Sequence, residues 1–247
     1  MMYTHAYSED IQSRINLIRN CQLEILEDKS KLSNLICELG LYFASNDNRN
    51  PKSFIQYGNQ GLRIWQNPDQ LAAYLIKIKD LKIDRYIEIG VAAGGTFITT
   101  IEYLKRFGQS PTAIAVDPYL GSTIKRKWVL DQYLRRNPKA RLIQNKSIKA
   151  INSIQDADLI FIDGNHKFEG VRSDYLMVRD TAGAIALHDI LGVQDVCAAW
   201  HLMKQHDSHM FNFFEFTDLP EEEYGTYRPG AMLGIGLAIK NEEETKT

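Results

Sequence analysis

Histidine and aspartate side chains follow two apolar runs in the second half of the sequence. The run LIFI is followed by Asp163 and, three residues later, by His166, and the run AIAL is followed by His188 and Asp189. A histidine, whose ordinary pKa is about 6.5, can accept a proton from a hydroxyl group near neutral pH. This spacing predicts that His166 and Asp163 face one substrate oxygen. A histidine that caps the next helix is the alternative interpretation.

A carboxylate and several glycines follow an earlier apolar run, in the segment EIGVAAGG that begins at Glu88. A glycine-rich turn into a helix lets a ligand approach bare backbone and its N–H groups. The dinucleotide pattern GxGxxG is not met, because Ala92 replaces its middle glycine, and Glu88 suits a cationic ligand better than a pyrophosphate. Asp117, 23 residues after Gly94, ends the next predicted strand, where a carboxylate accepts ribose hydroxyls. These residues predict a positively charged nucleoside ligand.

The frame that brings these side chains together begins at residue 85, where short apolar segments alternate with segments of helical periodicity. Strands are expected at 85–90, 112–117, 140–145, 157–163, 183–189, 210–216 and 232–240, and helices at 95–107, 122–137, 147–154, 169–180 and 193–205. Continuously apolar strands such as LIFI are typical of a parallel sheet covered by helices on both faces. We therefore expect an α/β fold with a doubly wound, mostly parallel sheet. Its ligands should bind at the carboxyl ends of the strands.

A helical extension is expected before this sheet. Apolar residues at helical spacing predict two helices between residues 8 and 45. Asn67 and Pro68 have the residue types that favour the N-cap and the first position of a further helix. We therefore divide the chain into N-terminal helices and lid, residues 1–80, and a ligand-binding domain, residues 81–247.

Composition and charge limit the classes of function. The 247 residues are 44% hydrophobic and 24% charged, as in an ordinary globular protein. The formal net charge of −2 gives no general attraction to nucleic acid or to an anionic membrane. No apolar run has the length of a membrane span, and the polar N-terminus predicts no signal peptide. Three cysteines without metal-type spacing favour reduced thiols, so we expect a cytoplasmic protein that binds neither nucleic acid nor membrane.

Residues 86–240 resemble the class I S-adenosylmethionine-dependent methyltransferases. The segment EIGVAAGG matches the glycine-rich first motif of that family, with a departure at Ala92, and VDPYL matches its second acidic motif. The resemblance implies a seven-stranded Rossmann-like sheet with an antiparallel last strand. It also implies S-adenosylmethionine as cofactor, with Asp117 at the ribose and Ser147 near the adenine. The alternative interpretation of Ser147 is that it caps a helix at its N-terminus. The other implied donor-binding residues are Glu88, Gly90, Ala92, Gly94, Gly95, Thr96 and Asp163.

A narrower resemblance concerns the segment IDGNHKFEGVRSDYLMVRDTAGAIALHDI, which is similar to the macrocin and mycinamicin O-methyltransferases and the cephalosporin-hydroxylase-like proteins. In the metal-dependent members of that branch, matching positions hold a magnesium ion. The resemblance therefore implies a metal site of Asp163, His188 and Asp189. Magnesium prefers oxygen ligands, and His188 stands where those members have an acid. The imidazole makes the site softer and open to Mg²⁺, to another divalent metal or to no metal.

The implied function is an S-adenosylmethionine-dependent O-methyltransferase that acts on a hydroxyl group of a small molecule, such as a sugar or a phenol. His166 would remove the proton from this hydroxyl group, with Asp163 beside it. The N-terminal helices and residues 53–68 would form a lid, and the loop 220–230 would contact the acceptor. A non-catalytic adenosyl-binding protein and an NAD-dependent oxidoreductase are the alternatives. The identity of the acceptor, the need for a metal and homo-oligomerisation stay open at this point.

Overall fold

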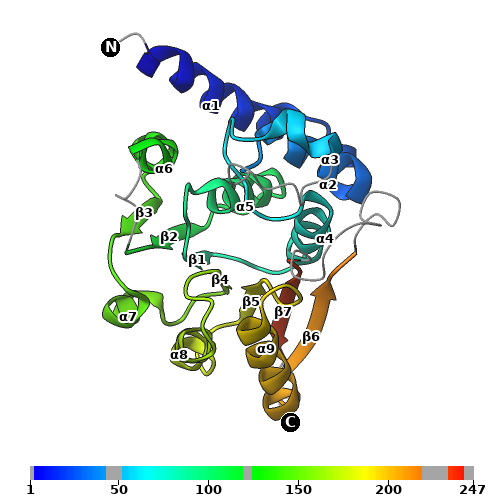
Figure 1. Cartoon of the computed structure of the whole chain (residues 1–247), viewed down its shortest axis with the longest axis vertical. Helices are drawn as coiled ribbons and strands as arrows, with labels where there is room; N and C mark the ends of the chain where they lie inside the picture. Colours follow the sequence, from blue (N-terminus) through cyan, green and yellow to red (C-terminus); the bar gives the residue numbers. More distant parts are fainter. Residues whose placement is uncertain (1–2, 43–51, 119–123, 219–232, 242–247) are drawn as a thin grey trace.

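The structure, a computed structural model, describes residues 3–42, 52–118, 124–218 and 233–241. Over those residues its centre is a seven-stranded sheet with the order β3-β2-β1-β4-β5-β7-β6 (Figure 1). The strands are β1 (Arg85–Ile89), β2 (Thr112–Val116), β3 (Ala140–Ile143), β4 (Leu159–Ile162), β5 (Ala184–His188), β6 (Phe211–Phe216) and β7 (Ile235–Lys240). Each strand lies within the range that the sequence predicted, so the α/β fold class is confirmed.

The pairing of the strands brings the predicted site residues to one edge. Strands β1 to β5 pair in parallel, whereas β7 runs antiparallel to both β5 and β6. Ile89 of β1 lies opposite Val116 of β2 and Ile162 of β4, so the residues that follow these three strands leave the sheet at the same level. The expected antiparallel last strand is confirmed.

Helices cover both faces of the sheet (Figure 1). On one face lie α4 (Pro68–Ile78), α5 (Gly95–Arg106) and α6 (Ile124–Arg136), and on the other lie the 3-10 helix η2 (Ser147–Ala150), α7 (Ile151–Ile154), α8 (Phe168–Val178) and α9 (Gln194–Asp207). Successive strand residues point to opposite faces, as strand geometry requires: Tyr86 packs in the core with α4 and α5, and Ile87 packs in the core with α8 and α9.

Among its described residues, the N-terminal segment contains three α-helices where two were predicted. They are α1 (Tyr3–Asn20), α2 (Leu23–Glu27) and α3 (Lys29–Leu39), followed after an interval by the 3-10 helix η1 (Lys52–Tyr57). The prediction was wrong because Asp28 begins a new helix: its side chain accepts a hydrogen bond from the backbone N–H of Lys31 at 3.0 Å. Apolar residues of α1 and α3 belong to the same buried cluster as those of α4 and α5.

A buried carboxylate joins this N-terminal segment to the helices on the sheet. Glu102 of α5 is 1% exposed and accepts hydrogen bonds from Arg19 of α1 at 2.5 Å, from Lys105 at 2.8 Å and from Tyr133 of α6 at 2.7 Å. Burial would raise the pKa of Glu102, but the hydrogen bonds from these donors hold the pKa below its ordinary value. The network fixes α1 against α5 and α6.

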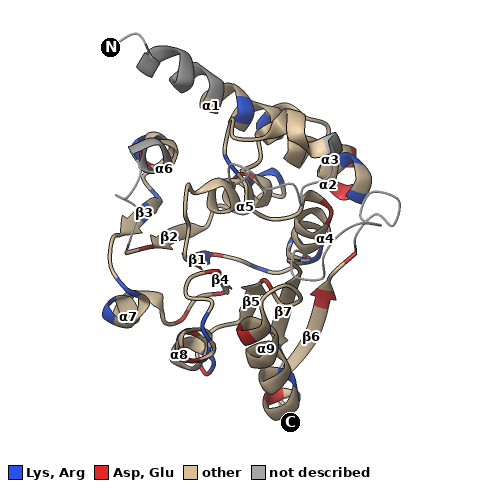
Figure 2. Ribbon diagram, in the orientation of Figure 1, with Lys and Arg blue, Asp and Glu red and all other residues tan. Residues whose placement is uncertain are grey.

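Charged residues are spread over the molecule. Figure 2 shows Lys and Arg interspersed with Asp and Glu along the described elements, which fits the small net charge. Within those residues, no helix combines the length and the apolar character that a bilayer crossing requires.

Candidate functional site at the carboxyl edge of the sheet

A cavity of about 950 Å³ lies at the carboxyl ends of β1, β2 and β4. Its position agrees with the general rule that open α/β sheets bind ligands outside these strand ends. The residues predicted from the sequence that line it are Glu88, Gly90, Ala92, Gly95, Thr96, Asp117, Ser147, Asp163 and His166. Gly94, His188 and Asp189 are not part of the described wall. The structure therefore gathers most of the predicted donor-binding residues around one space.

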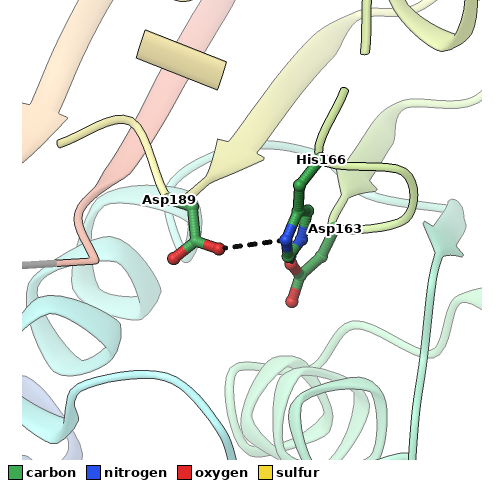
Figure 3. Close-up of side chains that lie close together, drawn as sticks. All are labelled: Asp163, His166 and Asp189. Atoms are coloured by element: carbon green, nitrogen blue, oxygen red, sulfur yellow. Dashed lines mark hydrogen bonds and ion pairs between the residues drawn. The ribbon is translucent and has the colours of Figure 1, made fainter. Parts of the chain in front are cut away.

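Two histidines and two aspartates form one group at the ends of β4 and β5. Nε2 of His166 lies 3.2 Å from Oδ1 of Asp163, and Nδ1 of His166 lies 3.5 Å from Oδ2 of Asp189 (Figure 3). Nδ1 of His188 lies 3.2 Å from the same oxygen of Asp163 and 3.5 Å from Oδ1 of Asp189. These contacts form because β4 and β5 are parallel neighbours, so the residues after them meet.

The charges in this group set its protonation. Burial opposes protonation of His188, but the negative charges of Asp163 and Asp189 raise its pKa to about 9. The hydrogen bond with Asp163 raises the pKa of His166 against the effect of burial, and the charges of both aspartates add to it. Burial would raise the pKa of Asp163, yet the charge of His188 and the hydrogen bonds from both histidines lower it. The two aspartates therefore favour the protonated form of His188.

The capping interpretations of two site residues are wrong. The N-cap of α8 is Lys167, which makes no side-chain cap, so His166 lies before the cap position and faces the aspartates. The N-cap of η2 is Lys146, and the hydroxyl of Ser147 donates a hydrogen bond of 2.5 Å to Oδ1 of Asp174. Both side chains are thereby directed into the site.

The group of side chains that could hold a metal ion includes His166, where the resemblance implied His188. Asp163, His166 and Asp189 each offer a ligand atom, and these atoms all lie within 4.8 Å of one another. His188 is 5% exposed, and its Nε2 is buried without a hydrogen-bond partner in the described part of the chain. Oδ1 of Asp189 also makes no hydrogen bond there. Two carboxylates and one imidazole suit a divalent cation, so the donor set fits such an ion.

Glu88 lies in the wall of the cavity with its carboxyl group almost fully removed from water. The residue is 2% exposed, and its Oε2 accepts a hydrogen bond of 2.5 Å from the hydroxyl of Tyr86. Burial raises the pKa of Glu88 to about 8, against the effect of this hydrogen bond, and the charge of Asp163 adds to the increase. A nearby positive charge on a ligand would favour the ionised carboxylate.

The glycines of the first motif allow other parts of the protein to approach closely. Gly90 has a φ of +84°, and a Cβ there would lie 2.1 Å from the carbonyl oxygen of Asp163. A Cβ on Gly95 would lie 2.6 Å from the carbonyl oxygen of Leu62. Gly94 faces Leu130 of α6 instead of the cavity. The bare backbone thus serves internal packing at all three positions, while Gly90 and Gly95 also line the cavity.

Asp117 connects the end of β2 to the glycine-rich loop. Its Oδ2 accepts a hydrogen bond of 3.1 Å from the backbone N–H of Ala92. Ala92 has a φ of +47°, a left-handed conformation in which glycine is more usual, and this hydrogen bond helps to fix it. Asp117 is 8% exposed and lines the cavity.

Gln66 is a site residue that the sequence did not point to individually. Its Oε1 accepts a hydrogen bond from the hydroxyl of Thr96, and its Nε2 donates one of 2.9 Å to Oδ2 of Asp163. The available signal was the helix start beside it, because the side chain of Asn67 caps α4 and fixes the chain there. Arg63 and Trp65 of the same segment also line the cavity. The predicted acceptor loop 220–230 lies outside the described residues.

Comparisons with known proteins concern the domain and its fold. Residues 87–190 match a family model described as a methyltransferase domain. No protein with curated annotation matches the chain. Among solved structures, the chain resembles an O-methyltransferase from Bacillus cereus in complex with SAH, with 14% identity, a TM-score of 0.51 and coverage of 97% of this chain and 100% of that one.

Two further solved structures share the fold. The O-methyltransferase TomG from Streptomyces achromogenes, in complex with SAM, has 12% identity, a TM-score of 0.52 and coverage of 73% of this chain and 82% of that one. An rRNA methylase from Streptococcus thermophilus has 12% identity, a TM-score of 0.51 and coverage of 70% and 97%. At these sequence identities the likeness shows a shared fold alone. One fold can serve enzymes that act on different kinds of acceptor.

Proposed function

We propose that this chain, which carries a class I S-adenosylmethionine-dependent methyltransferase domain, transfers the donor's methyl group to a hydroxyl oxygen of a small molecule. The observation that supports this best is the placement of His166 and Asp163 on the wall of the cavity that Glu88 and Asp117 also line. A proton acceptor and the expected binding residues for a charged nucleoside thus share one space. The small net charge, with Lys and Arg interspersed among Asp and Glu along the described elements (Figure 2), favours a small acceptor over a nucleic acid.

The donor lies along β1 and β2 in this proposal. Its sulfonium carries the methyl group that is transferred. Glu88 pairs with the positively charged methionine part, next to Gly90, Ala92, Gly95 and Thr96. Gly94 faces Leu130 and contributes the left-handed turn that leads into α5. Asp117 accepts the ribose hydroxyls, and Ser147 lies at the adenine. Methyl transfer is an in-line displacement, so the main contribution of these residues is to hold the donor in a fixed orientation away from water.

His166 is the proposed base for the acceptor. Its side chain is 45% exposed, so a hydroxyl group can reach it from the cavity. The oxygen of the acceptor hydroxyl forms its bond to the methyl carbon as the bond from this carbon to the donor sulfur breaks, so that S-adenosylhomocysteine is the leaving group. The hydroxyl proton goes to Nδ1 of the neutral imidazole, since Nε2 contacts Asp163. Asp163 orients the ring through the contact at Nε2 and stabilises the imidazolium that results. Asp189, on the other ring nitrogen, adds to this stabilisation.

A divalent metal is the second part of the proposal. Asp163 and Asp189, with His188 as the nitrogen ligand and His166 left free to act as the base, would hold it, and such an ion would lower the pKa of a bound hydroxyl group. Because the pKa of His188 is raised to about 9, the proton on this imidazole has to leave before its nitrogen can bind a metal. We infer that metal affinity increases with pH.

The N-terminal helices and residues 53–68 are proposed to close the site, and residues 81–247 to form the donor-binding domain. The contact of Gln66 with Asp163 supports this role for the connecting segment, because it reaches the acidic group of the site directly. Trp65 of this connecting segment lines the cavity. Its ring stacks on that of Tyr42, with the ring centroids 4.2 Å apart.

Thermal unfolding tests the donor. Tm is measured with S-adenosylmethionine, S-adenosylhomocysteine or NAD, each with Mg²⁺, with Mn²⁺ or with a chelator. We expect both adenosyl ligands to raise Tm, because a ligand that binds only the folded state stabilises it. Stabilisation by NAD alone would show that the proposed function is wrong. Donor binding and methyl transfer that are unaffected by chelator would remove the metal from the proposal.

Methyl transfer itself is measured as release of S-adenosylhomocysteine in the presence of a panel of sugars and phenols. We expect His166→Ala to lose about a hundredfold or more in rate while its affinity for S-adenosylhomocysteine is kept. The matched control is His209→Ala, which changes an exposed histidine outside the site. Equal rates for wild type and His166→Ala would exclude His166 as the base.

A further inference from the structure

Tyr74 of α4 has a buried hydroxyl group without a hydrogen-bond partner. The residue is 0% exposed, and its hydroxyl oxygen makes no hydrogen bond within the described part of the chain. Moving a hydroxyl group out of water without a hydrogen bond in return costs free energy. Buried polar groups in folded proteins nearly always have partners, so this one calls for a specific explanation. One explanation is a hydrogen bond that forms only when a ligand is bound.

Two phenylalanines of the sheet hold the ring of Tyr74. The ring packs edge-on with that of Phe161 of β4, with the ring centroids 5.5 Å apart, and with that of Phe216 of β6, with the centroids 6.1 Å apart. Edge-to-face contacts of this kind are a preferred geometry of aromatic pairs. The ring is therefore fixed against the sheet, next to β4.

The carboxyl group of Glu88 lies in the same place. Glu88 of β1 is the cross-strand partner of Phe161, and residues that lie opposite each other on neighbouring strands point to the same face of the sheet. Tyr86, two residues earlier, points there too and donates its hydroxyl hydrogen to Oε2 of Glu88. Burial raises the pKa of Tyr74, and the charge of Glu88 adds to the increase. The hydroxyl group of Tyr74 is therefore within electrostatic reach of this carboxyl group.

The protonation of Glu88 explains why the second hydroxyl group is unused without a ligand. A carboxylate can accept about four hydrogen bonds, and Tyr86 supplies one of them. Burial raises the pKa of Glu88 to about 8, so the neutral carboxyl group is favoured near neutral pH. A neutral carboxyl group is a weaker acceptor than a carboxylate. A cationic ligand favours the ionised form, which needs a further donor.

We propose that Tyr74 is a positioning residue for the methyl donor, whose positive charge ionises Glu88 so that the hydroxyl group of Tyr74 donates a hydrogen bond to the carboxylate. The inference rests on the proposed function, since it assumes that Glu88 pairs with S-adenosylmethionine. The buried hydroxyl group without a partner is an observation that does not depend on that function. Because α4 belongs to the N-terminal part of the chain, residues 1–80, the bond ties that part to the bound donor.

The test uses Tyr74→Phe, which removes the hydroxyl group and keeps the ring. Isothermal titration calorimetry with S-adenosylhomocysteine should show an affinity about tenfold or more below that of wild type, because a hydrogen bond to a charged group is lost. Tm of the free variant should equal or exceed that of wild type, because a buried hydroxyl group without a partner has been removed. In steady-state kinetics, KM for S-adenosylmethionine should rise while kcat is nearly kept, since the bond is present before and during methyl transfer.

Tyr103→Phe is the matched control. Tyr103 of α5 is also 0% exposed, but its hydroxyl group already donates to the carbonyl oxygen of Leu26 at 3.1 Å. This variant should show the opposite pattern, with a lower Tm and an unchanged affinity for S-adenosylhomocysteine. A lower Tm with an unchanged affinity in Tyr74→Phe as well would assign Tyr74 a purely structural role and overturn the inference.

A double-mutant cycle identifies the partner of the hydroxyl group. In a Glu88→Gln background, Tyr74→Phe should change the affinity by less than about twofold, because the carboxylate is no longer there. An effect of full size in that background would point to another partner, such as the buried Nε2 of His188, and overturn the inference. Equal affinities of wild type and Tyr74→Phe would overturn it too and leave the proposed function intact. Failure of wild type to bind S-adenosylhomocysteine would overturn both.

Discussion

The Nε2 atom of His166 lies 3.2 Å from Oδ1 of Asp163, three residues earlier in the chain. The loop after β4 thus carries a proton acceptor and the carboxylate that orients it, and both line the cavity. The same oxygen of Asp163 faces His188 at 3.2 Å, and His188 comes from the neighbouring strand. The protonation of His166 therefore depends on charges from two strands.

This arrangement predicts the titration of His166. Its pKa is raised, first by the hydrogen bond with Asp163 and then by the charges of Asp163 and Asp189, which stabilise the imidazolium. The neutral imidazole that can accept a proton should therefore form only above the ordinary value of about 6.5. We expect an NMR titration of the His166 ring to give a pKa above that value, and Asp189→Asn to lower it. An unchanged pKa in Asp189→Asn would contradict the assigned role of Asp189.

Donor binding should release protons from Glu88. Because its pKa is about 8, Glu88 is mostly protonated at pH 7 in the free protein, and a cationic ligand would favour the ionised form. The affinity for S-adenosylhomocysteine should therefore increase as pH rises from about 6.5 to 8.5. Calorimetry in two buffers of different ionisation enthalpy measures the protons released. Glu88→Gln should abolish both the release and the pH dependence, and an affinity that falls over this range would show that Glu88 does not pair with the ligand.

Removal of Gln66 should destabilise the fold and disturb the site together. Gln66→Ala leaves Oδ2 of Asp163 without its donor and the hydroxyl of Thr96 without its acceptor. We expect the free energy of unfolding to fall by about 1–3 kcal/mol, as for other buried polar groups that lose a partner. Urea denaturation measures this change. Gln56→Ala, at an exposed glutamine, is the control and should change stability by less than about 0.5 kcal/mol.

The contact between α1 and α5 should depend on the ionised form of Glu102. Its pKa is lowered in the folded protein, so it contributes stability above the unfolded value of about 4.5, and this contribution is lost as pH falls through the folded pKa. At pH 7 we expect Glu102→Gln to lower the free energy of unfolding by about 2 kcal/mol, because charge-assisted hydrogen bonds weaken. The difference from wild type should shrink in acid. An equal difference at pH 7 and at acid pH would exclude this charge effect, and Glu24→Gln serves as an exposed control.

Several features of the molecule followed from the sequence alone, because they depend on local patterns. Continuous apolar runs predicted the strands, and helical spacing predicted the helices between them, so the edge that gathers Glu88, Asp117 and Asp163 could be inferred without coordinates. The N-cap Asn67 was also visible, since capping depends on neighbouring residues. The division of the N-terminal segment into three helices could not be predicted, because Asp28 resembles any other polar surface residue in a helical stretch.

Tertiary structure alone decided which distant groups meet. Gln66 reaches Asp163 across 97 residues, and Ser147 reaches Asp174 across 27, and neither pair leaves a periodic signal. The glycines of the first motif predicted bare backbone, but only packing showed that Asp163 and Leu62 approach it. Burial of Glu88 and the charges around His188 likewise depend on neighbours from other strands. Local sequence determines the elements and the residue types at their ends, whereas pKa values and hydrogen-bond partners arise from contacts through space.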